Sequence, residues 1–171
     1  SDLIPRTQTT MAATSPLEAL LGPTLRKGTS DVATSSLASN EVIGLYFSAH
    51  WCPPCRGFTP KLVDTYKKLQ AAGKPFEVIF VSNDRDQAGF DEYFKEMPWI
   101  AVPLEDKERK QALSKRFDVS GIPAFMILDE NLNLINDDGR SAIDSDPEGA
   151  KFPWVAPKVR DMASPNGIDD Q

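Results

Sequence analysis

The segment that most constrains the fold runs from an apolar stretch into two cysteines and then into an amphipathic stretch. Residues 42–47 have the length, β-branching and aromatic content of a buried strand. From Phe58 to Leu69, apolar side chains recur at helical spacing, while lysines and an aspartate occupy the other face. We therefore expect Cys52 at a strand-to-helix turn and Cys55 in the first turn of the helix.

This position predicts a reactive dithiol. The first amides of a helix lack internal carbonyl partners and carry the positive end of its dipole, so a thiolate placed there is stabilised. Pro53 and Pro54 suit a first turn, where a missing N–H costs nothing, and they leave the Cys55 amide as the donor nearest to the Cys52 sulfur. Such settings lower a cysteine pKa from about 8.5 to roughly 3.5–7.5, and the i,i+3 spacing permits a disulfide.

Composition and charge limit the class of protein. With 171 residues, 40% apolar and 26% charged, the chain can form one compact core with extensions. A net charge of −6 and a pI of about 4.8 argue against a broad basic face, and no apolar stretch has the length of a membrane span. We therefore expect no nucleic-acid or membrane partner. The chain is also expected to be a monomer. Two cysteines in one C-x-x-C do not make a secreted disulfide framework, which favours the cytoplasm, or alternatively the nucleus.

The chain divides into three parts. Residues 1–15 are expected to be a flexible or cloning-derived leader, residues 16–158 one domain, and residues 159–171 a polar tail. Within the domain, residues 16–21 predict a short helix that ends at a Gly-Pro pair, and residues 24–38 predict edge strands or turns that cover the sheet.

A second informative part follows the cysteines. We expect a strand, a helix, an irregular or short extended segment and another helix over residues 76–82, 88–96, 97–103 and 105–117. Pro123 then stands at the entrance to an apolar strand that ends at Leu128, and after a turn at residues 129–131 a further strand is expected from Leu132 to Ile135. The alternation of strands and helices implies a parallel crossover and an α/β fold.

These motifs together resemble a known family. Residues 51–55 read W-C-P-P-C, and Gly121, Ile122 and Pro123 follow some 70 residues later. Three further motifs occur in the same order, at residues 56–60, 97–99 and 146–154. From about residue 18 to residue 158, the chain resembles the tryparedoxin and nucleoredoxin branch of the thioredoxin superfamily. The resemblance implies a thioredoxin-like fold, with a central mixed β-sheet flanked by helices and an N-terminal extension.

The resemblance also implies roles for individual residues. Cys52 would be the exposed nucleophile and Cys55 the resolving thiol. Pro123 would be a cis proline facing the dithiol, which leaves the Ile122 backbone free to pair with an extended substrate. The substrate-binding residues would be Trp51, Pro53, Pro54, Ile122, Pro123 and Arg140.

Some positions separate the two named groups of relatives. Arg140 aligns with an arginine that in tryparedoxins lies near the substrate derived from glutathionylspermidine. Tryparedoxins usually carry a tryptophan and then an acidic residue where this chain has Asn83 and Arg85, and this stretch is more similar to nucleoredoxin. Many thioredoxins have a buried aspartate where this chain has Tyr46, so proton transfer to Cys55 would use water, Tyr46 or another group.

The expected function is thiol-disulfide exchange with partner proteins. Cys52 would attack a disulfide in a protein such as a peroxidase, and Cys55 would release the reduced partner. We expect no bound cofactor, because neither a flavin nor a nicotinamide fingerprint is present. The electrons would come from an external dithiol such as trypanothione, from glutathione, or from thioredoxin reductase. The alternative function is a redox-gated binding module with little turnover.

Each motif also has a simpler interpretation. The C-x-x-C could be half of a zinc site, with His50 as the one histidine of the chain, or two inert buried thiols. His50 is expected to tune Cys52 rather than act as a general base. Arg140 could be a solvated charge at the end of a hairpin. Trp99, Phe152 and Trp154 are expected in the core rather than on a substrate platform, and the acidic clusters at residues 137–138 and 144–148 are expected to form turns rather than a calcium site.

Overall fold

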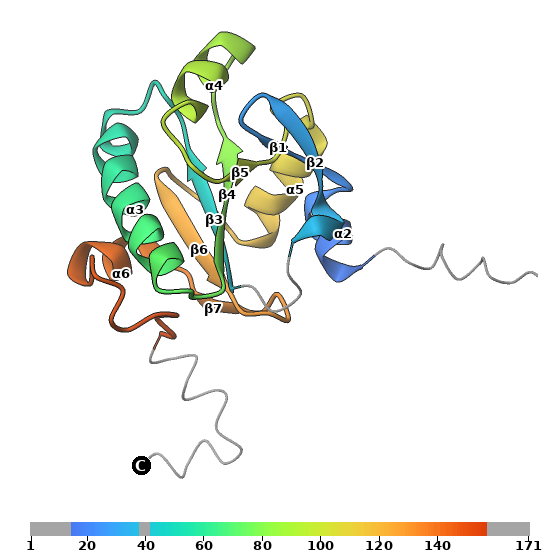
Figure 1. Cartoon of the computed structure of the whole chain (residues 1–171). Helices are drawn as coiled ribbons and strands as arrows, with labels where there is room; N and C mark the ends of the chain where they lie inside the picture. Colours follow the sequence, from blue (N-terminus) through green and yellow to red (C-terminus); the bar gives the residue numbers. More distant parts are fainter. Residues whose placement is uncertain (1–14, 38–41, 157–171) are drawn as a thin grey trace, which may run out of the picture.

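The computed structural model describes residues 15–37 and 42–156, which form a seven-stranded mixed sheet with helices on both faces (Figure 1). Its strands are β1 (Thr24–Lys27), β2 (Ser30–Ala33), β3 (Val42–Ser48), β4 (Phe76–Ser82), β5 (Ile100–Ala101), β6 (Ala124–Leu128) and β7 (Leu134–Asn136). They lie in the order β2-β1-β5-β4-β3-β6-β7, so β3 and β4 are central. The expected thioredoxin-like α/β fold is confirmed.

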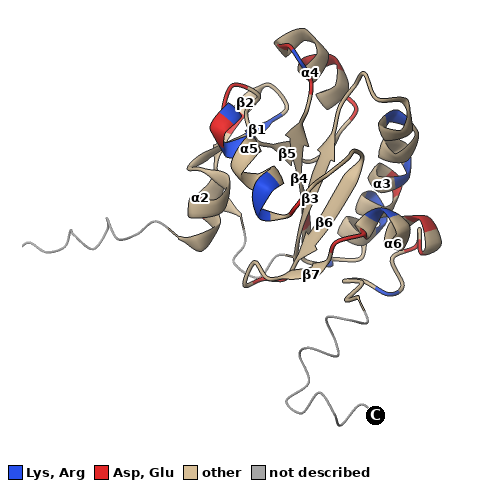
Figure 2. Ribbon diagram, turned by 180° about the vertical axis from the view of Figure 1, so that it is seen from behind, with Lys and Arg blue, Asp and Glu red and all other residues tan. Residues whose placement is uncertain are grey.

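The helices form two layers (Figures 1 and 2). They are α2 (Pro16–Leu21), α3 (Pro53–Ala71), α4 (Gln87–Phe94), α5 (Lys107–Arg116) and α6 (Gly139–Ser145), with the 3₁₀ turn η1 (Thr34–Ser36). One apolar cluster joins the sheet to α3, α4 and α6, and the other joins it to α2 and α5. Every residue of β3 is buried because both faces of the sheet are covered. Its side chains alternate, so Tyr46 packs in the first cluster and Phe47 in the second.

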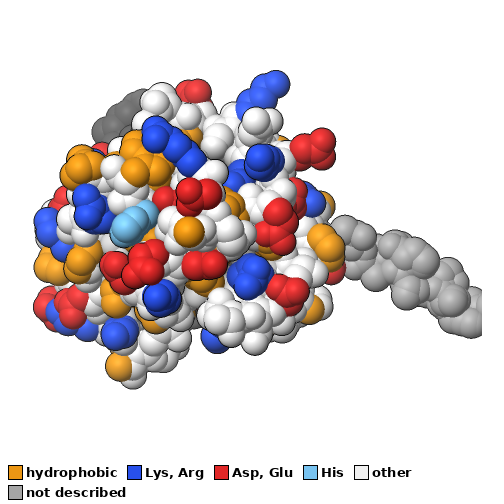
Figure 3. Space-filling view, turned by 90° about the horizontal axis from the view of Figure 1, so that it is seen from above, with side chains coloured by type: hydrophobic (Ala, Val, Ile, Leu, Met, Phe, Trp, Pro, Cys, Tyr) orange, Lys and Arg blue, Asp and Glu red, His pale blue; other side chains and the backbone are white. Residues whose placement is uncertain are grey.

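The β3-α3-β4 unit positions the dithiol. β3 and β4 are parallel, and their register pairs Val42 with Phe76 and Ser48 with Ser82. Both strands therefore end at the same level, and the loops that follow them meet at one end of the sheet. Figure 3 shows this end of the molecule from above, with hydrophobic, cationic and acidic side chains intermixed. The parallel crossover expected from the sequence is confirmed.

The N-terminal segment extends the sheet. β1 and β2 form an antiparallel hairpin, and β1 also pairs with β5. Before it, α2 begins with a capping box, in which the Ser15 side chain accepts from the Glu18 N–H and the Glu18 carboxylate accepts from the Ser15 N–H. The expectation of strands after residue 24 is confirmed over residues 24–33, and β2 is the edge strand. The expectation that this segment covers the sheet is wrong, because β1 pairs with β5 and so extends the sheet. The short extended segment is confirmed as β5.

The final strand is shorter than expected. The Asp129 carboxylate accepts N–H hydrogen bonds from Asn131 and Asn133, both at 2.9 Å, which prolongs the turn. Leu132 lies within this turn at a φ of 67°, and β7 begins only at Leu134. The expectation of a strand beginning at Leu132 is wrong, because the Asp129 side chain organises a longer turn than Gly and Pro positions indicated.

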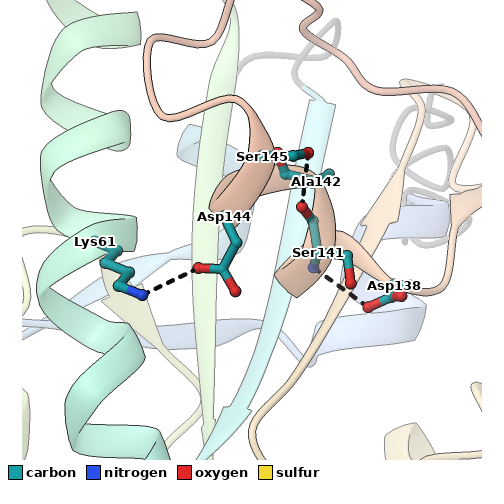
Figure 4. Close-up of polar contacts among 6 residues, drawn as sticks. All are labelled: Lys61, Asp138, Ser141, Ala142, Asp144 and Ser145. Carbon is teal, nitrogen blue, oxygen red and sulfur yellow. Dashed lines mark hydrogen bonds and ion pairs between the residues drawn. The ribbon is translucent and has the colours of Figure 1, made fainter.

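A short helix stands where the sequence suggested only polar turns (Figure 4). In α6, the Asp138 side chain accepts from the Ser141 N–H at 3.3 Å, and an Asp144–Lys61 ion pair of 3.4 Å joins α6 to α3. Within α6, the apolar side chains are those of Ala142 and Ile143, which are adjacent in sequence, so the segment shows no helical periodicity of apolar residues. The interpretation of Arg140 as a solvated charge at the end of a hairpin is wrong in its location, because Arg140 belongs to α6, but its side chain is exposed as that interpretation expected.

The expected leader and tail fall almost entirely outside the described residues. Of the leader, residues 1–14 lie outside and only Ser15 is described, as the N-cap of α2. The tail at residues 159–171 also lies outside. Within residues 15–37 and 42–156, no helix is both long enough and apolar enough to cross a membrane.

Candidate active site

The two cysteines occupy the start of α3, as the sequence predicted. Cys52 is the N-cap and forms a disulfide with Cys55, and their Cα atoms are 5.2 Å apart. The Cys55 N–H donates to Cys52 Sγ at 3.3 Å. Pro53 and Pro54 fill the first two helical positions without competing N–H groups. The Cys52 sulfur therefore lies against the one backbone amide that this first turn directs at it.

The disulfide itself is more buried than expected. Cys52 is 5% exposed and Cys55 is 0% exposed, and both pack against Ala49 and Ile122. The expectation of an exposed Cys52 is wrong for this oxidised form, because Ala49, Cys55 and Ile122 pack against its side chain. Pro53 and Pro54 are exposed around it.

Ile122 and Pro123 face the dithiol, as the resemblance implied. The peptide bond between them is cis, and the Ile122 carbonyl oxygen lies 4.0 Å from Cys52 Sγ. Pro123 is buried, whereas Ile122 is partly exposed and packs against the two cysteines. This arrangement brings a backbone acceptor from the loop before β6 next to the sulfur at the start of α3.

Trp51 projects from the site and is held by the loop after β4. It is 47% exposed, its Nε1–H donates to the Asn83 carbonyl at 3.0 Å, and the Arg85 guanidinium lies 4.9 Å from the centre of its ring. Sequence reasoning singled out Asn83 and Arg85 only as departures from tryparedoxins. The signal for this contact was their position directly after β4, since parallel strands end at the same edge.

A buried carboxylate fixes the loop before Trp51. Asp84 is 8% exposed and accepts the His50 backbone N–H at 2.7 Å and the Ser82 hydroxyl at 2.8 Å. The His50 ring lies 5.6 Å from the Tyr93 ring, measured between centroids. Asp84 was not expected at the site, and the tuning role of His50 stays a prediction.

A group of buried hydroxyls lies beneath the dithiol on the α3 side. Thr59 Oγ1 is its centre, because it lies 2.5 Å from the Tyr46 hydroxyl, 2.6 Å from the Tyr93 hydroxyl and 3.0 Å from the Cys55 carbonyl oxygen. The Tyr46 hydroxyl also lies 3.3 Å from that carbonyl, and Ser48 Oγ lies 2.6 Å from the Tyr93 hydroxyl. Burial, and then the neighbouring Tyr93, raise the pKa of Tyr46, so its phenol stays protonated at neutral pH. The hydroxyls of Tyr46 and Thr59 thus both contact the backbone carbonyl of Cys55.

Arg140 lies on the other side of the cis proline. It is exposed near the start of α6 and lines a hollow of about 310 Å³ that also contains Pro123 and Phe125. The structure thus brings Arg140 and Pro123 together around one hollow, and the substrate role of Arg140 stays a prediction.

The remaining aromatic and acidic residues have structural positions. Trp99 is 1% exposed and Trp154 is 5% exposed, and both belong to the core cluster under α3, against which Phe152 packs. Asp146 organises the turn before Trp154 by accepting from the Lys151 N–H and from the Trp154 indole. Among the described residues, no group of three or more His, Cys, Asp and Glu side chains is arranged to hold a metal ion.

The chain is similar to characterised proteins along most of its described length. A Thioredoxin-like family model matches residues 40–134. Nucleoredoxin from Mus musculus is 42% identical over 151 residues, which is 88% of this chain and 34% of that protein. Tryparedoxin from Trypanosoma brucei brucei is 41% identical over 125 residues, or 72% of this chain and 85% of that protein. The chain therefore spans about a third of the length of the nucleoredoxins that it matches.

Solved structures of tryparedoxins are also similar to this chain. The crystal structure of native tryparedoxin I from Crithidia fasciculata has a TM-score of 0.77 and 42% identity, and the match covers 83% of this chain and 99% of that one. Together with the Cys52–Cys55 disulfide at the start of α3, these matches show that the chain belongs to the thioredoxin-like family, in the branch of tryparedoxins and nucleoredoxins with a redox-active C-x-x-C pair.

Proposed function

We propose that this chain is a protein-disulfide reductase that works by thiol-disulfide exchange. The thiolate of reduced Cys52 attacks one sulfur of a partner disulfide and expels the other as a thiolate, which takes up a proton. Cys55 then loses its proton and attacks Cys52 Sγ, which releases the second partner thiol and leaves the Cys52–Cys55 disulfide. Two electrons and two protons pass to the partner in each cycle.

One observation supports this proposal above the others, namely the 3.3 Å contact from the Cys55 N–H to Cys52 Sγ at the first turn of α3. A donor and the positive end of a helix dipole both favour the thiolate over the thiol. A lowered thiol pKa increases the fraction of nucleophile near neutral pH, and it also makes Cys52 a better leaving group when Cys55 attacks.

The surroundings of the dithiol suit an extended partner segment. The Ile122 carbonyl oxygen lies 4.0 Å from Cys52 Sγ, and Trp51 presents an exposed ring on the side of the β4 loop. A partner strand could pair with the Ile122 backbone while its disulfide meets Cys52. We therefore propose disulfide-containing proteins, such as oxidised peroxidases, as substrates.

The proposed electron donor is an external dithiol or a reductase in the same compartment, which we take to be the cytoplasm. Tryparedoxin II, a structural relative with a TM-score of 0.77, was solved in complex with glutathionylspermidine. A low-molecular-weight thiol of this kind is thus one candidate donor for this chain. Parallel assays with trypanothione, glutathione and thioredoxin reductase compare the candidates directly.

Two serine variants test the mechanism with dithiothreitol as reductant and insulin disulfides as substrate. Cys52→Ser should reduce insulin no faster than dithiothreitol alone, because the attacking sulfur is absent. Cys55→Ser should trap its substrate. When this variant is first reduced, freed of dithiothreitol and then mixed with insulin, a mixed disulfide through Cys52 should accumulate and be visible by mass spectrometry. Full turnover by Cys52→Ser, or adducts that form through Cys55 instead, would contradict these roles.

A redox-gated binding module is the second candidate, and the low exposure of the oxidised dithiol favours it. A disulfide that is only 5% exposed at Cys52 is reached by a reductant only after local movement, which would slow turnover. Capture with Cys55→Ser separates the two candidates. Many different trapped proteins together with fast insulin reduction fit the reductase, whereas one stoichiometric partner and slow reduction fit the module.

A further inference from the structure

A cationic groove lies beside the dithiol, in a protein whose net charge is −6. It is a hollow of about 790 Å³ between Trp51, the loop after β4 and one face of α5. Four cationic side chains line it, together with two carboxylates: Arg85, Lys107, Lys110, Lys115, Asp84 and Asp118. Figure 2 shows blue segments along α5, and Figure 3 shows blue side chains beside hydrophobic ones at this end of the molecule.

The groove has its charges on one surface because of helical spacing. Lys107, Lys110 and Lys115 line it from α5. Lys107 is three residues from Lys110 and eight from Lys115, so it shares a face of the helix with each of them, and the other two lysines flank it on either side. Arg85 approaches from the opposite wall, where its guanidinium packs over Trp51. The cations of both walls therefore face one space, and the wall at Trp51 is next in sequence to Cys52.

These cations form no ion pair within the described part of the chain. None of the four forms an ion pair of 4 Å or less there, whereas Arg26, Lys61, Lys68, Lys95 and Arg109 each do. The carboxylate of Asp84 is engaged by the His50 N–H and the Ser82 hydroxyl. Partial burial, and then repulsion from Lys107, lower the pKa of Lys110, although Asp84, Asp106 and Glu105 offset part of this effect. A negative charge in the groove would offset the repulsion between Lys107 and Lys110.

We propose that this groove binds an acidic segment, rich in Asp and Glu, of the same protein whose disulfide Cys52 reduces. The inference rests on the proposed function, since the occupant must also place its disulfide at Cys52. A polypeptide meets both conditions, because residues flanking the disulfide reach past Trp51 into the groove. Exposed complementary charges mainly accelerate association and select partners. The groove thus sets the substrate preference of the dithiol.

Paired disulfide peptides test this inference. The peptides share one cystine and differ only in a flank that carries aspartates in one and asparagines in the other. We expect kcat/KM of the wild-type protein to be about tenfold higher for the acidic peptide, and this ratio to approach one as ionic strength rises from about 0.02 to about 0.5 M. This comparison at low and high ionic strength uses the wild-type protein alone.

Variants that change charge then test whether the preference for the acidic peptide arises in the groove. Lys107→Gln combined with Lys110→Gln should lower the acidic-to-neutral ratio by about two- to fivefold, and the corresponding Glu pair should bring it below one. The matched control is Lys67→Gln combined with Lys74→Gln, which removes the same charge from exposed lysines outside the groove and should preserve the ratio. Circular dichroism checks the fold of each variant.

The outcomes distinguish the two proposals. If neither peptide is reduced, the proposed reductase function fails. If both are reduced at equal kcat/KM at low salt, or the control pair lowers the ratio as much as the groove pair, the groove inference is overturned and the reductase stands. An acidic peptide without cysteine should compete with the acidic substrate better than an oligonucleotide of equal charge. The reverse order would overturn the assignment to an acidic polypeptide.

Discussion

The buried hydroxyl group beneath the dithiol gives the sharpest stability prediction. Tyr46, Ser48, Thr59 and Tyr93 are each at most 1% exposed. Their four hydroxyl protons serve five close contacts, so one contact cannot be a hydrogen bond at any instant. The single proton of Tyr46 goes either to Thr59 Oγ1 or to the Cys55 carbonyl oxygen. When it is removed, both acceptors keep another donor, because Tyr93 serves Thr59 and Thr59 serves Cys55.

This count sets the expected magnitudes. Tyr46→Phe removes one hydrogen bond and orphans no partner, which corresponds to about 1 kcal/mol of unfolding free energy. Thr59→Val keeps the shape of the side chain but removes two hydrogen bonds. Tyr46 still donates to the Cys55 carbonyl oxygen, but Ser48 and Tyr93 are left with one contact for two protons, so one buried hydroxyl proton has no acceptor, which costs about 1–3 kcal/mol. We therefore expect Thr59→Val to cost more than Tyr46→Phe.

Urea denaturation of the oxidised protein, followed by circular dichroism, measures these differences. Ser145→Ala is the control, because it removes an exposed hydroxyl that donates to the Ser141 carbonyl, and it should change the unfolding free energy by no more than about 0.5 kcal/mol. A cost of Tyr46→Phe equal to or greater than that of Thr59→Val would refute the reasoning.

Two further predictions concern packing and pH. A Cβ at Gly139 would lie 2.5 Å from Phe125 Cδ2 and 2.7 Å from the Phe125 carbonyl oxygen, so Gly139→Ala should lower the melting temperature by several degrees, which corresponds to more than about 1 kcal/mol. Gly57→Ala is its control, because a Cβ there meets nothing within 4 Å in α3 and should stabilise the helix by up to about 1 kcal/mol; equal effects of the two would contradict the packing. Burial raises the pKa of Glu77 in the folded protein, despite the hydrogen bond from Tyr66. In the unfolded chain the pKa of this carboxyl is about 4.3, so the folded state keeps the proton to higher pH than the unfolded state does. The wild type therefore loses stability as pH rises from the unfolded-state pKa of Glu77 through its folded-state pKa. Urea unfolding should show Glu77→Gln to be more stable than the wild type at about pH 7 but not below about pH 4. A difference between the two proteins that does not change with pH would rule this out.

The part of the site that depends on neighbouring residues in sequence could be predicted. A buried strand, two cysteines, two prolines and an amphipathic helix are local signals, and they placed the Cys55 N–H against Cys52 Sγ before any contact was known. The cis bond before Pro123 followed from the family resemblance. Both depend on a few consecutive residues and on backbone chemistry that those residues dictate.

Features that join distant segments could not be predicted in the same way. Thr59 meets Tyr93 across 34 residues and His50 meets Asp84 across the same separation, and no spacing in the sequence marks either pair. The burial of Cys52 depends on Ile122, 70 residues away. The helix α6 was missed because it is held by one capping side chain and by tertiary contacts, instead of by a repeating apolar face.

The central claim is that the start of α3 stabilises the thiolate of Cys52. The most direct test is the rate of iodoacetamide alkylation as a function of pH in the Cys55→Ser protein, in which Cys52 is the one remaining thiol. The account predicts an inflection below about pH 7.5, with rapid alkylation at neutral pH. An inflection near the ordinary value of about 8.5 would contradict it.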